Sequence, residues 1–269
     1  RQVMELFRTS DGTALNYRSM GKGYPIVMIH SIYMNHTVFE DIATRLARYF
    51  QVILIDLRGH GYSDKPLAID FHEYSQDIKE LMDFLYIESA TVIGNELGST
   101  VALDLTLSAS NKVSELILIN PTVDDTLLPH ERLFRKYAET IRTCNESEQE
   151  KFLEKHLYHA KGKVRKFLKN VNDSEALLTD YEKTAVDHSF TENGLEKILP
   201  EIHVRTLIIA GQANERVTPN ESKHVAELMP NATYELFNKS GVYPFVEEKE
   251  KFLKQVKDFM QRTTHHMEL

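Results

Sequence analysis

The sequence has a single cysteine, Cys144, among its 269 residues. One cysteine cannot form a bond with a second one in the same chain, so a framework of internal disulfides is excluded. No apolar run approaches the roughly 20 residues that a membrane-spanning helix needs. The first residues also have no apolar core of the kind found in signal peptides. We therefore expect a cytoplasmic protein that does not act at a membrane.

An excess of positive charge is also lacking. The chain has 32 Lys and Arg against 40 Asp and Glu, which gives a formal net charge of −8. Non-specific nucleic-acid binders carry basic surfaces, so no nucleic-acid partner is expected. The length suits one large domain, or a core with an insertion.

Apolar runs alternate with amphipathic segments along most of the chain. Continuous runs at 26–29, 52–55, 116–119 and 206–210 predict strands that are buried on both faces. Segments such as 74–85 and 221–228 have the spacing of helices. This alternation predicts an α/β fold with a mostly parallel, doubly wound sheet of about eight strands, covered by helices on both sides.

Residues 125–190 interrupt the alternation. They contain no strand signal, and short amphipathic helices are predicted at 130–142, 148–156 and 174–188. We interpret this segment as a helical cap over the carboxyl edge of the sheet, with 1–124 and 191–269 forming the core. A small apolar or amphipathic molecule is expected to bind between cap and sheet. A cap surface that binds a protein partner is an alternative hypothesis.

The segment 90–99 combines a short β-branched run, two glycines and the start of a helical pattern. Gly94 ends the apolar run, Glu96 follows two residues later, and Gly98 comes two residues after that. This is the spacing of the nucleophile elbow G-x-S-x-G, with glutamate in the place of serine. Glycines suit such a turn, because strand and helix must approach closely beside a strained residue.

With this elbow and three further motifs, the chain resembles the α/β-hydrolase family over nearly its whole length. His30 and Ser31 lie where that family has the His-Gly of its oxyanion loop. Residues 56–63 match its D-x-R-G-x-G-x-S segment, and residues 241–248 resemble its G-H-x-P-x-x-E-x block. The resemblance implies the α/β-hydrolase fold, with nucleophile, acid and histidine in that chain order.

The residues at these three catalytic positions differ from those of the family. Glu96 stands at the nucleophile position and Val242 at the histidine position. The acid position is Asn214 when counted from the preceding glycine, and Glu215 when counted back from the following Thr-Pro. Valine cannot transfer a proton, so serine-type hydrolysis is not expected. The resemblance therefore implies a degenerate catalytic triad.

Two interpretations of Glu96 follow. In the first, its carboxylate fills the oxyanion hole formed by the N–H groups of Leu97 and of the Ser31–Ile32 loop, where a helix N-terminus favours an anion. The protein would then be a non-hydrolytic, pseudoenzyme-like binder of a small molecule, with Ser31, Ile32, Tyr33 and Leu97 lining the pocket. This is the main prediction. In the alternative, Glu96 is the general base or carboxylate nucleophile of an atypical hydrolase or lyase.

Arg216 and two histidines are further candidates near this site. Arg216 lies on the acid loop, and it either pairs with Glu96, since an unpaired buried carboxylate is costly, or points to solvent. His30 and His36 lie near the oxyanion loop and are alternatives to the missing base, although a structural role is favoured.

A metal site is not predicted. His156 and His159 have loose metal-ligand spacing with Glu154, but the exposed face of an amphipathic helix explains all three residues. No metal and no other cofactor is expected.

Overall fold

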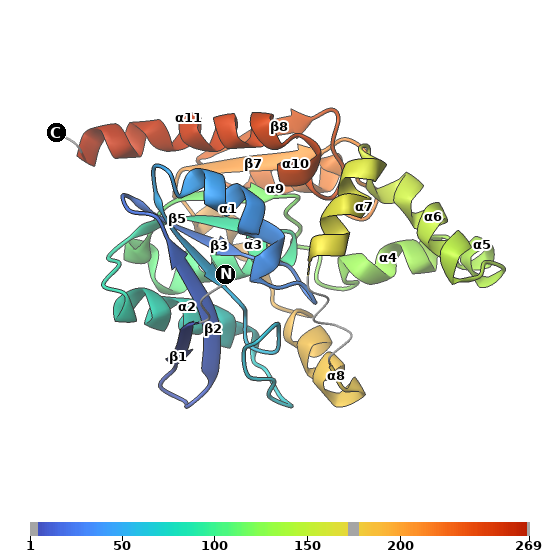
Figure 1. Ribbon diagram of the computed structural model, residues 1–269, viewed down its shortest axis with the longest axis horizontal. Coiled ribbons are helices and arrows are strands. Elements are labelled where there is room, and N and C mark those ends of the chain that lie inside the picture. Colours follow the sequence, from blue (N-terminus) through green and yellow to red (C-terminus); the bar gives the residue numbers. More distant parts are fainter. Residues whose placement is uncertain (1–4, 172–177, 268–269) are drawn as a thin grey trace.

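A computed structural model describes residues 5–171 and 178–267 of the chain (Figure 1). Its centre is an eight-stranded sheet in the order β1-β2-β4-β3-β5-β6-β7-β8. The pairs β1–β2 and β2–β4 are antiparallel, and all the others are parallel. The strands are β1 Glu5–Arg8, β2 Ala14–Met20, β3 Pro25–Ile29, β4 Gln51–Ile55, β5 Ala90–Asn95, β6 Val113–Ile119, β7 Thr206–Gly211 and β8 Ala232–Phe237. The predicted α/β-hydrolase fold, with its mostly parallel sheet, is confirmed.

Helices cover both faces of the sheet. The core helices are α1 Glu40–Leu46, α2 Phe71–Phe84, α3 Leu97–Ser108, α9 Pro219–Leu228, α10 Pro244–Glu247 and α11 Lys249–Met267, with short 3-10 helices η1 His36–Phe39, η2 Ser110–Lys112 and η4 Leu195–Glu201. Successive side chains of a strand point to opposite faces. On β3, Val27 therefore joins the core under α2, α3 and α9, while Met28 joins the core under α1 and α11. The continuous apolar runs of the sequence are explained by this double burial.

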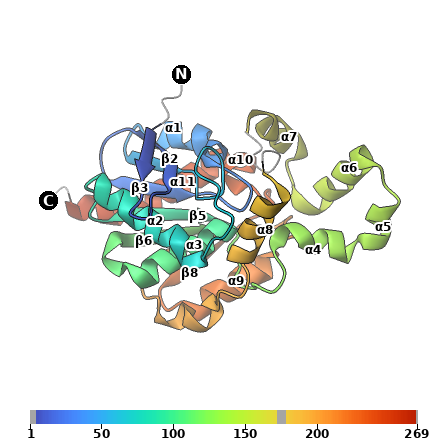
Figure 2. The same ribbon diagram turned by 90° about the horizontal axis from the view of Figure 1, so that it is seen from below.

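An insertion of helices lies between β6 and β7. Its described helices are α4 Pro129–Lys136, α5 Ala138–Arg142, α6 Glu146–Leu157, α7 Lys161–Asn170 and α8 Asp180–Ser189. Figures 1 and 2 show these helices beyond one end of the sheet, with α5 and α6 farthest from it. This is the end toward which β7 and β8 point, so the insertion follows the carboxyl ends of the strands.

The insertion differs in detail from the sequence prediction. The helix predicted at 130–142 is two helices, because the backbone leaves helical geometry at Tyr137, with φ −114° and ψ 28°. The helix predicted at 174–188 begins at Asp180 in the structure, after a capping box formed by Thr179 and Glu182; residues 174–177 lie outside the described part. Helix α7 was not specifically predicted.

Backbone hydrogen bonds fasten the insertion to the loops that follow β7 and β8. The N–H of Glu215 donates to the carbonyl of His156 at 2.9 Å, and the N–H of Val242 donates to the carbonyl of Leu157 at 2.9 Å. The end of α6 is therefore held against the two loops that carry the acid and histidine positions. Across the described ranges, no helix combines the length and the apolar character needed to cross a bilayer.

Candidate functional site at the β5–α3 turn

Glu96 occupies the sharp turn between β5 and α3. Its backbone has φ 52° and ψ −111°, which is the strained conformation expected of the elbow residue. Its N–H donates to the carbonyl of Ile119 at 2.8 Å, which anchors the turn to β6. Positive φ is uncommon for a residue with a side chain, and such strain persists only where the surrounding structure holds it in place.

The two glycines of the elbow allow strand and helix to approach closely. A Cβ on Gly94 would lie 2.7 Å from the carbonyl oxygen of Gly98, and a Cβ on Gly98 would lie 2.4 Å from the carbonyl oxygen of Ile29. These neighbours are backbone atoms that cannot move aside easily. The glycine spacing read from the sequence is therefore a requirement of the packing of α3 on β3 and β5.

Both oxygens of the Glu96 carboxylate accept hydrogen bonds. Ser31 Oγ donates to Oε1 at 3.1 Å. Arg216 donates to Oε2 through Nε at 3.0 Å, and its Nη2 lies 2.9 Å from the same oxygen in an ion pair. The Glu96 side chain is 3% exposed and that of Arg216 is 18% exposed. Of the two alternatives for Arg216, the structure has the ion pair with Glu96.

The oxyanion hole is not filled in the way the sequence suggested. The Leu97 N–H donates to Ser31 Oγ at 3.2 Å and not to the carboxylate. A hydroxyl both accepts and donates, so Ser31 bridges the amide and Glu96. Ser31 is 4% exposed, and its neighbour Ile32 is also buried. The expectation that the carboxylate itself occupies the amide site at Leu97 is therefore wrong, because the side chain of Ser31 lies between them.

The electrostatics of Arg216 are dominated by burial and by its anionic neighbour. Burial alone would lower the pKa of Arg216, but the negative charge of Glu96, helped by Tyr243 and Tyr158, outweighs it and raises that pKa. Burial raises the pKa of Tyr243 and that of Tyr158. The guanidinium therefore stays charged beside two neutral phenols.

Tyr243 and Tyr158 lie beside Arg216, and the sequence analysis did not identify either of them. Their rings stack with centroids 5.9 Å apart, and Arg216 hydrogen-bonds to Tyr243. Tyr243 follows Val242, which is itself buried with its carbonyl accepting from Asn120 Nδ2 at 3.1 Å. The position next to the expected histidine was the only available signal.

The two candidates for the acid position, Asn214 and Glu215, have different partners in the structure. Asn214 Oδ1 accepts from the N–H groups of Arg216 at 2.9 Å and Val217 at 3.0 Å, which shapes the loop. Its Nδ2 is buried and has no hydrogen-bond partner among the described residues. Glu215 instead turns to the insertion, where it pairs with His156 Nδ1. Within the described ranges, neither residue hydrogen-bonds to Glu96.

The Glu215–His156 pair is part of a small cluster at the edge of the insertion. Tyr137 OH donates to Glu215 at 3.2 Å, and the Tyr137 ring stacks on His156 with centroids 4.4 Å apart. Burial would raise the pKa of Glu215, but His156 and Tyr137 outweigh it and lower that pKa. This cluster joins the acid loop to α4 and α6.

Tyr33 connects the oxyanion loop to the insertion. Its backbone has φ 62°, and its hydroxyl donates to Asp187 of α8 at 2.6 Å. His130 of α4 approaches the same carboxylate at 3.4 Å and packs edge-on against the Tyr33 ring. Tyr33 is thus placed at the junction of loop and insertion, whereas Ser31 reaches the elbow.

The loop histidines are held in structural contacts. His30 Nδ1 donates to the carbonyl of Ser31 at 2.7 Å, while its Nε2 accepts from the N–H of Leu57 at 3.0 Å. Burial lowers the pKa of His30 to about 4, so the ring is neutral near pH 7. His36 contacts the buried Asp56 at 2.8 Å. Both nitrogens of His30 and the Nδ1 of His36 therefore make contacts within the fold.

The residues with loose metal spacing are engaged elsewhere. Glu154 forms an ion pair with Arg165 at 2.8 Å, and His156 is paired with Glu215. In the part of the chain that the structure describes, no group of three or more His, Cys, Asp or Glu side chains is arranged to hold a metal ion.

Comparisons with known proteins agree with this architecture. The profile of one family, described as the alpha/beta hydrolase fold, matches residues 24–249. An uncharacterized protein of Mycobacterium tuberculosis is 37% identical over 115 residues, or 42% of this chain; the match spans about a third (34%) of that protein's length. A pimeloyl-(acyl-carrier protein) methyl ester esterase of Aliivibrio fischeri is 22% identical over 93% of this chain and 98% of its own. The solved structure of an esterase from Exiguobacterium antarcticum has a TM-score of 0.77 at 23% identity, covering 95% of this chain and 98% of that one.

These relatives contradict the prediction of a non-hydrolytic, pseudoenzyme-like binding protein, because the two that match over more than nine-tenths of the chain are named as esterases. The geometry also differs from the one that prediction assumed. The carboxylate is not isolated in an amide hole, since a hydroxyl lies 3.1 Å from it.

Proposed function

Because the chain belongs to the α/β-hydrolase fold family, we propose that it is an atypical hydrolase of small apolar or amphipathic esters, with Glu96 as its general base. Relatives named as esterases support the substrate class. The observation that carries the proposal is the hydrogen bond from Ser31 Oγ to Glu96 Oε1 at 3.1 Å. That distance is within the reach expected of a nucleophile and its base.

In this proposal, Ser31 is the nucleophile in place of an elbow serine. Glu96 Oε1 takes the hydroxyl proton while Ser31 Oγ bonds to the acyl carbon of the ester. The tetrahedral intermediate then expels the alcohol, which takes the proton from Glu96 and leaves an acyl group on Ser31. Water, deprotonated by Glu96, then attacks the acyl carbon. The bond between this carbon and Ser31 Oγ breaks, Oγ takes the proton back from Glu96, and the acid is released with both side chains restored. No histidine is required, so valine at position 242 is compatible with the cycle.

In this proposal, the positive charge of Arg216 interacts with the negative charge that moves during proton transfer. In the resting state its charge balances the carboxylate of Glu96, 2.9 Å away. When Glu96 accepts the proton it becomes neutral, and the negative charge moves to the tetrahedral oxyanion. In this proposal the fixed cation 2.9 Å from Glu96 also contributes to stabilising that developing charge without reorganisation.

Glu96 as a direct carboxylate nucleophile is less favoured by the contacts. Each of its oxygens already accepts a hydrogen bond, Oε1 from Ser31 and Oε2 from Arg216, which also forms the ion pair with Oε2. Attack by Oε2 would compete with Arg216, and Oε1 is the oxygen positioned to take the Ser31 proton. The predicted cap at 125–190, with Tyr33 at its junction, would enclose the ester in this proposal.

The test is the hydrolysis of a panel of p-nitrophenyl esters and small lactones. Glu96→Gln and Ser31→Ala are each expected to lower kcat at least ~100-fold, as loss of a base or nucleophile does. Lys223→Glu, an exposed change on α9, should leave turnover unchanged. Circular dichroism and melting temperatures show whether each variant is folded. Turnover that survives Glu96→Gln in a folded protein would reject the proposal.

Isotope labelling separates the two roles of Glu96. A carboxylate nucleophile would form a mixed anhydride with the acyl group of the ester. In a single turnover in ¹⁸O-labelled water, attack of water on the Glu96 carbonyl carbon of this anhydride would leave ¹⁸O in Glu96. A general base would gain none. We expect unlabelled Glu96 in the corresponding peptide.

A further inference from the structure

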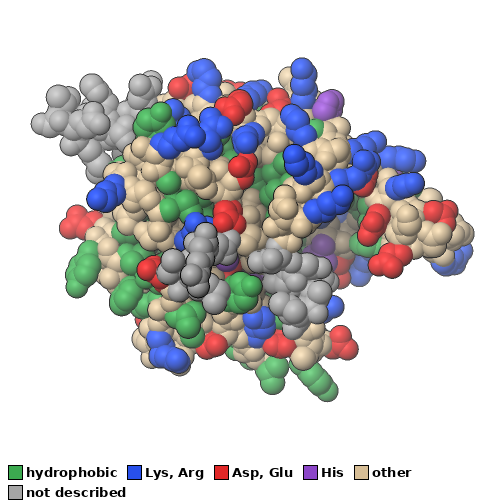
Figure 3. Space-filling model, viewed as in Figure 1, with side chains coloured by type: hydrophobic (Ala, Val, Ile, Leu, Met, Phe, Trp, Pro, Cys, Tyr) green, Lys and Arg blue, Asp and Glu red, His purple; other side chains and the backbone are tan. Residues whose placement is uncertain are grey.

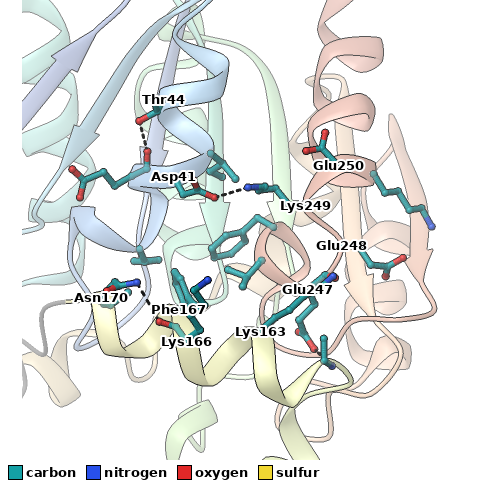
Figure 4. Close-up of a pocket in the computed structure, with 18 of the residues that line it drawn as sticks. Asp41, Thr44, Lys163, Lys166, Phe167, Asn170, Glu247, Glu248, Lys249 and Glu250 are labelled. Carbon is teal, nitrogen blue, oxygen red and sulfur yellow. Dashed lines mark hydrogen bonds and ion pairs between the residues drawn. The ribbon is translucent and has the colours of Figure 1, made fainter.

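A groove separate from the elbow opens between α1, α7 and the start of α11. It has a volume of about 1200 Å³, and its walls come from the η1–α1 segment, from α7 and from residues 245–251 (Figure 4). Ser31, Glu96 and Arg216 do not line it. We call it the α7 groove.

The acidic side chains of the α7 groove are already satisfied. Three of them have cationic partners, in the pairs Glu40–Arg18, Asp41–Lys249 and Glu250–Arg45. Glu247 is buried and accepts from the N–H groups of His159, Ala160, Gly241 and Tyr243. Glu248 accepts from the N–H of Lys239 and the hydroxyl of Ser240. Little negative charge is therefore left to attract a cation into the groove.

Several lysines of the same walls have no anionic partner. Lys166 and Lys239 are exposed, and their ammonium groups make no hydrogen bond or ion pair with any described residue. Among the described residues, the one hydrogen-bond acceptor of Lys163 Nζ is the carbonyl oxygen of Glu247 at 3.2 Å, and a carbonyl carries no net charge. The walls of the groove therefore carry ammonium groups that have no anionic partner among the described residues.

Helix α7 concentrates this charge. In a chain with net charge −8, its ten residues include five Lys or Arg and no Asp or Glu. Figure 3 shows Lys and Arg side chains gathered on the face over this helix. Such a local reversal of sign favours an anionic ligand at this face.

The wall of α7 also has an apolar part. Phe167 is partly buried, with its ring centroid 5.2 Å from that of Tyr243 and 6.2 Å from that of Phe245. Val246 is likewise partly buried beside it. In Figure 4, Phe167 and Lys163 rise from α7 into the space that faces α1 and α10. Apolar surface bordered by unpaired ammonium groups suits a molecule with a hydrocarbon chain and an anionic head.

We propose that the α7 groove is a binding site for an amphipathic carboxylate. The hydrocarbon chain lies along Phe167 and Val246, and the carboxylate is bound by Lys163 and Lys166. This site is independent of the elbow chemistry.

Calorimetric titration with dodecanoate tests the proposal. Wild-type protein is expected to bind one dodecanoate saturably, and Lys163→Glu/Lys166→Glu is expected to weaken binding at least tenfold. Both lysines are exposed, so the variant should keep the wild-type melting temperature. Lys223→Glu is the control, since it reverses the charge of one exposed lysine on α9, away from the groove, and should not affect binding.

Two probes separate the contributions of head and chain. Acetate has the head without the chain, and dodecyltrimethylammonium has the chain with the opposite charge. Both should bind at least tenfold more weakly than dodecanoate. Equal binding of the ammonium compound would overturn the proposal. Dodecanoate binding that survives the double lysine variant but is lost in Glu96→Gln would place the ligand at the elbow and would also overturn it.

Discussion

Removal of Arg216 should strongly destabilise the protein. Arg216→Ala leaves the carboxylate of Glu96, 3% exposed, with Ser31 as its remaining side-chain donor. At 2.9 Å and an effective dielectric of about 20, the lost attraction is about 6 kcal/mol. Water entering the space of a side chain that is 18% exposed recovers part of this. We therefore expect a loss of ~3–5 kcal/mol, the usual cost of orphaning a buried charge.

Urea denaturation at pH 7 measures this loss, with the slope m expected to stay unchanged. Arg142→Ala is the control, because Arg142 is 73% exposed and pairs with Glu139, which is 86% exposed; its effect should be within about 0.5 kcal/mol. Glu96→Gln/Arg216→Ala should be more stable than Arg216→Ala alone, since no charge is left unpaired. An Arg216→Ala midpoint equal to that of Arg142→Ala would refute the reasoning.

Two further predictions concern packing and pH. Gly98→Ala should cost at least ~2 kcal/mol, because its Cβ would lie 2.4 Å from the Ile29 carbonyl oxygen, whereas Gly162→Ala on α7 has open space and should be neutral or slightly stabilising; equal melting temperatures for the two variants would contradict this. Burial lowers the pKa of His30 from 6.5 to about 4 and that of His60 to about 3, so the unfolded chain binds protons that the folded protein does not. The stability that the two neutral rings contribute is present above pH 6.5 and is lost as pH falls toward 4. We therefore expect the free energy of unfolding to drop by a few kcal/mol between pH 7 and pH 5. A free energy of unfolding that does not change over this range would be inconsistent with neutral buried rings.

The fold could be predicted from the sequence because its signals are local. A run such as 26–29 is apolar at every position, and this follows from burial on both faces of a parallel sheet. The glycines around Glu96 could be read in the same way, since close packing at the elbow excludes a Cβ at each.

The contacts of the site could not be predicted in that way. Ser31 and Glu96 are 65 residues apart, and Glu96 and Arg216 are 120 apart. No local pattern determines which of two polar side chains a carboxylate will meet across such distances. The pairing of Glu215 with His156 depends on where the insertion lies, which the sequence pattern does not determine.

Covalent labelling with a fluorophosphonate ester tests whether Ser31 is a nucleophile that Glu96 deprotonates. Peptide mass spectrometry of the labelled wild-type protein should find the phosphonyl group on Ser31, no adduct in Ser31→Ala, and labelling at least ~100-fold slower in Glu96→Gln. An adduct on a different residue, or a labelling rate unchanged in folded Glu96→Gln, would contradict the account.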